Sequence, residues 1–182
     1  MSILDGKKNI HFVGIGGSGM YPIVQILAGR GYTITGSDVN EGDIINYERA
    51  MGIKVNIPHE ASAVEGADLG VYSAAIFKDN CELARAAELG IPCIERSIML
   101  GEVSRFFEKS ICVSGTHGKT TTTTLIHKMM EKQGYKTWLG GNIGNPLLPL
   151  IEDMLERGYS PHAQLNLKTD PPKKGPVFLN KG

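Results

Sequence analysis

The sequence predicts an α/β protein in which helices cover both faces of a parallel sheet. Short apolar runs of strand length alternate with longer segments whose apolar residues recur at helical spacing. Two glycine-containing loops, at 14–19 and 115–120, each follow a predicted strand and precede a predicted helix. Strands separated by helix-length segments pair in parallel, and such a sheet is covered by helices on both faces.

The predicted elements divide the chain into three parts. A Rossmann-like domain covers 1–105, the opening of a P-loop-type ATPase domain covers 106–157, and an irregular tail covers 158–182. The tail holds four of the nine prolines and loses all periodicity, so we expect a loose segment there. The expected strands lie at 10–15, 32–38, 53–55, 68–74, 91–95, 110–114 and 135–140. The expected helices lie at 19–32, 42–51, 81–90, 96–107, 119–134 and 146–157.

Composition and charge exclude several classes of protein. Hydrophobic residues make up 41% of the 182 residues, and 19 basic residues balance 19 acidic ones. A neutral chain of ordinary hydrophobicity indicates a packed core and gives no electrostatic reason to bind nucleic acid or a membrane surface. The three cysteines lack metal-ligand spacing, and we expect them to be core thiols. No apolar run approaches the roughly 18 residues of a membrane span, and the N-terminus is unlike a signal peptide, so we expect a cytoplasmic protein.

The first glycine loop has the spacing of a diphosphate site. Gly14, Gly16 and Gly19 form G-x-G-x-x-G between a strand and a helix. The first glycine permits the tight turn, the second lets the backbone approach a diphosphate, and the third lets the helix pack on the strand. Asp38, at the end of the second strand, is placed to accept a hydrogen bond from a ribose hydroxyl. This loop alone favours an NAD-dependent dehydrogenase, and a tight turn without a ligand is the alternative.

The second loop has the chemistry of a triphosphate site with shortened spacing. Val113 stands where the usual P-loop has its first glycine, so the match is the shorter G-x-x-G-K-T at 115–120. Backbone N–H groups of such a loop bind oxyanions, Lys119 can reach the β and γ phosphates, and the Thr120 hydroxyl can bind Mg²⁺. A polar helix start would explain the threonines but not the lysine.

Taken together, the two loops and the stretches between them resemble the N-terminal part of the Mur ligases. The similar stretches, in order, are "IHFVGIGGSGM" (10–20), "GSD" (36–38), "YSAAIFKDN" (72–80), "ELGIP" (88–92), "RSIMLGEV" (96–103) and "VSGTHGKTTTT" (113–123). The resemblance covers roughly 7–157 and is nearest to the L-alanine-adding members, which share His117. The segment 139–148 is more similar to the D-glutamate-adding members, so the amino acid stays open.

The resemblance implies that two loops serve two nucleotides. The first would hold a UDP-sugar and the second ATP, for ATP- and Mg²⁺-dependent ligation of L-alanine to UDP-N-acetylmuramate in peptidoglycan precursor synthesis. Lys119 and Thr120 would be catalytic, and Thr120 would bind the metal. The implied UDP-sugar residues are Gly14, Gly16, Gly17, Ser18, Gly19, Asp38 and Ser73. The implied ATP residues are Gly115, Thr116, His117, Gly118, Lys119, Thr120 and Thr121.

Several expectations concern the chain as a whole. We expect a truncated chain that binds UDP-sugar through 1–105 but is inactive alone, with self-association through an uncovered central sheet. A dehydrogenase and a non-catalytic nucleotide-binding module remain alternatives. Two histidines have open roles: His11 is expected to be a hydrogen-bonded core residue, and His59 is either a residue of the uracil pocket or a surface histidine.

Overall fold

The computed structural model describes residues 2–106, 109–135, 137–141 and 177–181. The contacts divide the chain into two compact units, Met1–Glu102 and Val103–Gly182. The predicted domain boundary after residue 105 stays a prediction. None of the described helices is long and apolar enough to cross a membrane.

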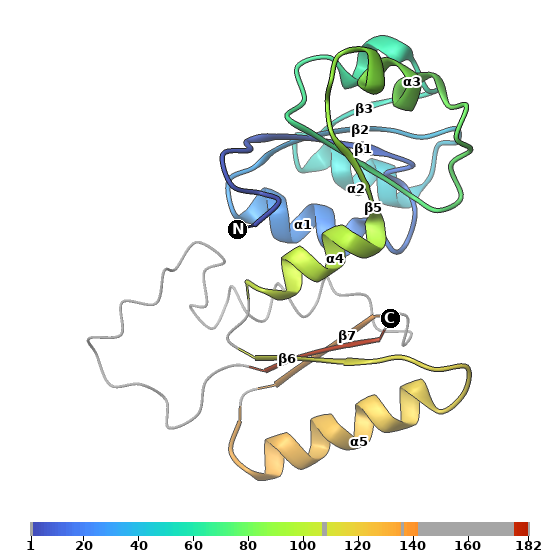
Figure 1. Cartoon of the computed structure of the whole chain (residues 1–182). Coiled ribbons are helices and arrows are strands. Elements are labelled where there is room, and N and C mark those ends of the chain that lie inside the picture. The colour runs from blue at the N-terminus through green and yellow to red at the C-terminus, as the bar shows by residue number, and fades with distance from the viewer. Residues whose placement is uncertain (1, 107–108, 136, 142–176, 182) are drawn as a thin grey trace. The chain divides into compact units, whose positions relative to one another are not determined.

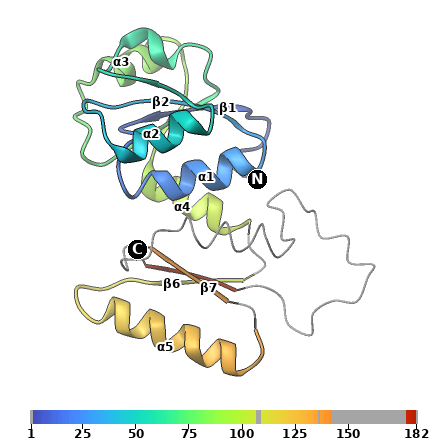
Figure 2. The same ribbon diagram turned by 180° about the vertical axis from the view of Figure 1, so that it is seen from behind.

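The first unit is a five-stranded parallel sheet with helices on both faces (Figure 1). Its strands are β1 (Asn9–Val13), β2 (Thr33–Ser37), β3 (Lys54–Asn56), β4 (Leu69–Tyr72) and β5 (Cys93–Glu95). Its helices are α1 (Tyr21–Gly29), α2 (Asp43–Ala50), the 3-10 helix η1 (Ala61–Val64), α3 (Cys81–Glu88) and all but the last two residues of α4 (Arg96–Ser104). Figures 1 and 2 show α1 and α2 on one face of the sheet and α3 on the other. The predicted fold class is confirmed.

The strand order, β3-β2-β1-β4-β5, places β1 at the centre with β2 and β4 on either side. Ile10 of β1 pairs with Ile34 of β2 and with Leu69 of β4. Phe12 of β1 and Leu69 of β4 are completely buried, because a parallel sheet covered on both faces hides its central strands. From β1 the chain adds β2 and β3 on one side of the sheet, and then returns to add β4 and β5 on the other side. Open α/β sheets bind ligands at the carboxyl ends of the two strands, here β1 and β4, between which the direction changes.

Local sequence signals explain where the helices begin and end. Pro22 lies in the first turn of α1, as predicted, and α1 stops before Gly31, whose φ is 83°. Asn80 caps α3, because its side-chain oxygen accepts the backbone N–H groups of Glu82 at 2.9 Å and of Leu83 at 3.4 Å. The helices predicted at 19–32 and 96–107 are present but shorter than expected, since α1 covers Tyr21–Gly29 and α4 covers Arg96–Ser104.

The second unit contains β6 (Lys109–Val113), α5 (Lys119–Lys132), β7 (Thr137–Gly141) and β8 (Val177–Lys181). Its sheet has the order β6-β8-β7 with every pair parallel. The strand–loop–helix order predicted for the second glycine loop is confirmed. The predicted helix at 146–157 lies outside the described residues.

Two expectations are wrong. The segment 158–182 was expected to be an irregular tail, yet Val177–Lys181 is the middle strand of the second sheet. The apolar run Val-Phe-Leu after Pro176 is long enough for a strand between two others, while 158–176 lies outside the described residues.

The cysteines were expected in the core, but Cys81 and Cys112 are exposed and Cys93 is half-buried.

Candidate functional site

The first glycine loop is fixed to the end of β2 by its own backbone. The N–H groups of Gly14 and Ile15 both donate to the Ser37 carbonyl, at 2.8 and 3.0 Å. Gly14 has φ +81°, a conformation that residues with a side chain rarely adopt. The loop therefore leaves β1 through a tight turn that holds it beside β2.

The second glycine of the motif lies close to two neighbouring side chains. A Cβ at Gly16 would lie 3.0 Å from Ile45 of α2 and 3.1 Å from the Asp38 carboxylate. A side chain at this position would require the side chains of Ile45 and Asp38 to shift. The role predicted for Gly16, close approach of the backbone to a diphosphate, stays a prediction. Gly17, Ser18 and Gly19 are exposed.

Asp38 directly follows β2 and holds the loop. Its Oδ2 accepts the Gly16 N–H at 2.9 Å, and its Oδ1 accepts the Val39 N–H at 2.7 Å. A carboxylate oxygen can accept more than one hydrogen bond, so these contacts leave acceptor capacity for a ligand hydroxyl. The ribose role of Asp38 stays a prediction.

The structure also brings Ser73 to the loop. Ser73 follows β4, its N–H donates to the Val13 carbonyl at 3.3 Å, and its Cβ would lie 3.5 Å from a Cβ at Gly14. Gly14, Asp38 and Ser73 follow β1, β2 and β4 and meet at the carboxyl edge of the sheet. The predicted UDP-sugar residues thus form one group at the position where such sheets bind ligands.

Arg96 is a residue of this site that the sequence analysis missed. A Cβ at Gly19 would lie 3.1 Å from one guanidinium nitrogen of Arg96, so the cation lies against the glycine loop at the start of α1. A guanidinium beside exposed backbone N–H groups suits a diphosphate. A sequence pattern that could have identified Arg96 is its position directly after β5, Cys93–Glu95, the last strand of the first unit. This position lies at the same edge of the sheet as the glycine loop.

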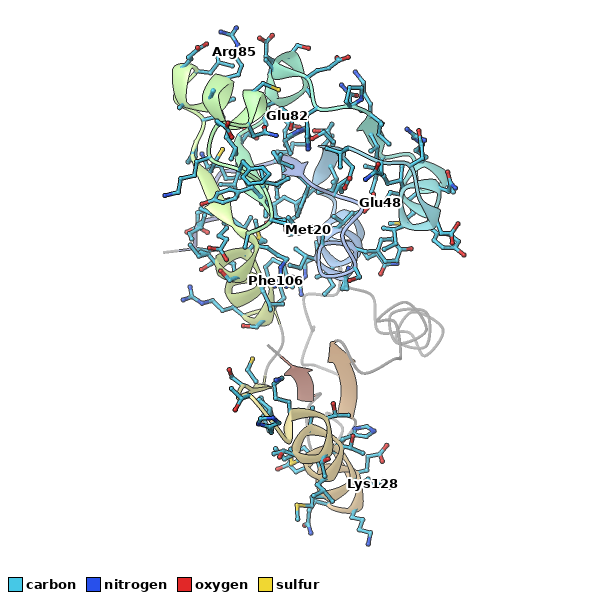
Figure 3. The ribbon with its side chains drawn as sticks, turned by 90° about the vertical axis from the view of Figure 1, so that its right-hand side faces the viewer. Met20, Glu48, Glu82, Arg85, Phe106 and Lys128 are labelled. Carbon is cyan, nitrogen blue, oxygen red and sulfur yellow. The ribbon has the colours of Figure 1, made fainter. Side chains whose placement is uncertain are left out.

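Glu48 of α2 is a buried carboxyl group close to this site. Its side chain is completely buried, and neither carboxyl oxygen has a hydrogen-bond partner in the described residues. Figure 3 shows it on the side of α2 that faces the rest of the unit. Burial, with a smaller contribution from the negative charge of Asp38, raises the pKa of Glu48 to about 8. The carboxyl group is therefore mainly protonated at neutral pH.

A polar hollow lies on the face of the sheet opposite α1 and α2. It has a volume of about 440 Å³, and His11, Thr35, Lys54 and Glu60 are among its lining residues. None of the predicted UDP-sugar residues lines it. The short η1 lies beside this hollow, where Lys54 is exposed and Thr35 is half-buried, whereas His11 is completely buried.

The second loop leads into the N-terminus of α5. Gly118 is in the left-handed conformation with φ 74°, and its carbonyl accepts the Thr122 N–H at 2.9 Å to begin the helix. The residues 115–118 are exposed. The first N–H groups of a helix have no partner within it, so this end of α5 can bind an anion.

Lys119 lies over this loop. Its Nζ donates to the Gly115 carbonyl and, at 3.4 Å, to the Thr116 carbonyl. Thr120, in the first turn of α5, is exposed. A hydroxyl oxygen there fits the oxygen coordination of Mg²⁺, whose other ligands would come from phosphates and water. The assignment of 115–121 to ATP stays a prediction.

Comparisons with known proteins find relatives of both units. Residues 9–108 match the family described as Mur ligase family, catalytic domain, and residues 113–170 match the Mur ligase middle domain. A UDP-N-acetylmuramate–L-alanine ligase of Caldanaerobacter subterraneus subsp. tengcongensis is 46% identical over 77% of this chain and 31% of its own length. The enzyme of that name from Persephonella marina is 48% identical over 70% of this chain and 28% of its own length.

Solved structures agree with these relatives. The UDP-N-acetylmuramate-alanine ligase of Thermotoga maritima matches with a TM-score of 0.61 and 32% identity, over 71% of this chain and 30% of that chain. A Neisseria meningitides enzyme, UDP-N-acetylmuramate:L-alanyl-gamma-D-glutamyl-meso-diaminopimelate ligase, shares the fold alone. Its TM-score is 0.68 at 24% identity, over 97% of this chain and 52% of that one. The chain spans less than a third of the length of the curated relatives named above.

Proposed function

The chain belongs to the Mur ligase family, and we propose that it supplies the UDP-sugar site and the ATP loop for ligation of L-alanine to UDP-N-acetylmuramate. The observation that carries the proposal is the presence of two phosphate-type loops, each between a parallel strand and a helix, in two separate compact units. One loop per unit suits two nucleotides bound at once.

The first unit would bind the UDP-sugar. Helix α1 directs its N-terminus at the loop of Gly14, Gly16 and Gly19, and Arg96 adds a positive charge beside it. Both features stabilise the negative charge of a diphosphate. Asp38 and Ser73 lie on neighbouring strand ends, where they would hydrogen-bond the hydroxyl groups of the ligand.

The second loop would bind ATP and hold its γ-phosphoryl group for transfer. The lactyl carboxylate of UDP-N-acetylmuramate attacks this phosphorus, ADP leaves, and an acyl phosphate forms. The amine of L-alanine then attacks the acyl carbon, so that an amide forms, inorganic phosphate leaves and the amine loses a proton. Lys119 would neutralise charge on the transferred group, and Thr120 would hold Mg²⁺, which supplies further neutralisation. We assign this reaction to peptidoglycan precursor synthesis in the cytoplasm.

A dehydrogenase that binds NAD through the first loop is the other candidate. The motif and Asp38 favour it, but it gives the loop around Lys119 no role. Titration calorimetry of the chain with UDP-N-acetylmuramate, UDP and NAD separates the two. We expect both uridine nucleotides to bind more tightly than NAD, and tighter binding of NAD would favour the dehydrogenase.

A further inference from the structure

Glu82 joins four parts of the first unit through one buried carboxylate. It lies in the first turn of α3 and is completely buried (Figure 3). Its Oε2 accepts hydrogen bonds from Ser37 Oγ at 2.6 Å and from His11 Nε2 at 3.2 Å. Its Oε1 accepts the Glu60 N–H at 3.0 Å and lies 3.5 Å from His59 Nδ1.

The carboxylate is ionised despite its burial. Burial alone would raise the pKa of Glu82, but the hydrogen bonds from His11 and Ser37 and the nearby His11 outweigh it, so the pKa lies below the ordinary value. An ionised carboxylate can only accept hydrogen bonds. Every group that contacts Glu82 must therefore turn a proton toward it.

This requirement fixes the proton on His59. The Ser37 hydroxyl donates its only proton to Glu82, so Ser37 Oγ can only accept from His59 Nδ1, 2.8 Å away. Nδ1 of His59 must then carry a proton. In the neutral ring, Nε2 is left with a lone pair and is a hydrogen-bond acceptor.

The acceptor lies near the predicted nucleotide site. His59 follows β3, and Ser37 is the last residue of β2, directly before Asp38. The His59 side chain is 12% exposed, and Nε2 has no hydrogen-bond partner among the residues that the structure describes. A ring nitrogen without a partner at the carboxyl edge of the sheet is available to a ligand.

We propose that Glu82 is a positioning residue, which holds His59 with Nε2 as the acceptor for a hydrogen-bond donor of the uridine moiety. The inference rests on the proposed function, because it requires a uridine nucleotide at this edge. Uridine offers two kinds of donor, the imide N–H of the base and the ribose hydroxyls. Glu82 acts through His59 and Ser37 and touches no ligand itself.

The proton position can be measured without a ligand. Nitrogen-15 NMR of histidine side chains in the 182-residue chain distinguishes a protonated ring nitrogen from one with a lone pair, and loss of a signal in His59→Phe assigns it. We expect a protonated Nδ1 and an unprotonated Nε2 in neutral His59. The opposite tautomer would overturn the proposal.

Ligand discrimination tests the functional half of the proposal. Calorimetry compares UDP with N3-methyl-UDP, which lacks the imide donor, and with 2′-deoxy-UDP and 3′-deoxy-UDP, each of which lacks one ribose donor. We expect one analogue to bind about tenfold more weakly, the factor for one lost hydrogen bond, and that analogue identifies the donor. Equal affinity for UDP and all three analogues overturns this inference and leaves the proposed function standing. No binding of UDP overturns both.

Two variants separate positioning from a purely structural role. In Glu82→Gln and in His59→Phe we expect the ratio of UDP to analogue affinity to fall to about one, with ATP affinity unchanged. His59→Phe leaves the carboxylate and its other contacts in place, so it carries the test if Glu82→Gln does not fold. If Glu82→Gln weakens UDP and its analogues equally and keeps the ratio, Glu82 is structural only and the positioning role is wrong.

Discussion

Replacement of Glu48 by leucine should stabilise the first unit, and by an amount that depends on pH. The carboxyl group is completely buried without a partner, and its pKa rises from an ordinary 4.5 to about 8 in the folded chain. Between these two values the unfolded state releases the proton while the folded state keeps it. The contribution of Glu48 to the stability of the wild-type chain therefore falls as the pH rises from 4.5 to 8 and is level above that.

The size of the effect follows from the pKa difference. At pH 7 the free energy of unfolding is lowered by at most about 3 kcal/mol, since each unit of pKa corresponds to about 1.36 kcal/mol. Leucine removes this cost and the smaller cost of a buried carboxyl group without a hydrogen bond. We expect Glu48→Leu to gain about 1 to 3 kcal/mol more over the wild type at pH 7 than at pH 4.5.

Urea unfolding at pH 4.5, 6, 7 and 8 measures this gain. The NMR amide signals of β1, Asn9–Val13, report on the first unit separately from the second. Asn46→Leu is the control, because Asn46 is an exposed residue of the same helix and its replacement removes no titratable group, so its effect should not change with pH. The reasoning is refuted if the stability gap between Glu48→Leu and the wild type is the same at pH 4.5 and pH 7.

Three further predictions follow from other sites. Lys119→Ala should weaken ATP binding at least tenfold. Lys128→Ala is the control, since Lys128 is an exposed residue of the same helix and its replacement should not change ATP binding. If calorimetry gives the wild type and Lys119→Ala the same affinity for ATP, the loop is not a phosphate site. Arg96→Ala should weaken UDP about tenfold in low salt and less in high salt, because exposed charge attraction is screened; unchanged affinity would remove Arg96 from the site. Gly36→Ala should lower the free energy of unfolding by about 2 kcal/mol or more, because a Cβ at this position would lie 2.9 Å from the Phe12 carbonyl oxygen. Gly42→Ala, which has open space around it, should leave the free energy of unfolding nearly unchanged in the same urea assay.

The sequence predicted the elements that carry the phosphate loops, because their signals are local. Gly14 and Pro22 fix a turn and a helix start within a few residues, and the apolar run before each loop is read directly. Strand β8 was missed because a short apolar run after a proline-rich segment has no periodicity to mark it. Its partners, β6 and β7, lie far away in the sequence.

The missed site residues depend on contacts between distant parts of the chain. Glu82 meets Ser37 across 45 positions and His11 across 71, and no local pattern shows that these side chains share one buried point. Only the strand order brings β1, β2 and α3 together there. His11 itself was predicted correctly as a hydrogen-bonded core residue, because a histidine inside a buried strand needs a partner.

The central claim is that two loops serve two different nucleotides, and one titration tests it directly. UDP-N-acetylmuramate is titrated calorimetrically into the chain, first alone and then with saturating ATP and Mg²⁺. We predict that one equivalent of UDP-N-acetylmuramate binds in both cases with an affinity that ATP does not abolish. Displacement of UDP-N-acetylmuramate by ATP, in competition for a single site, would contradict the account.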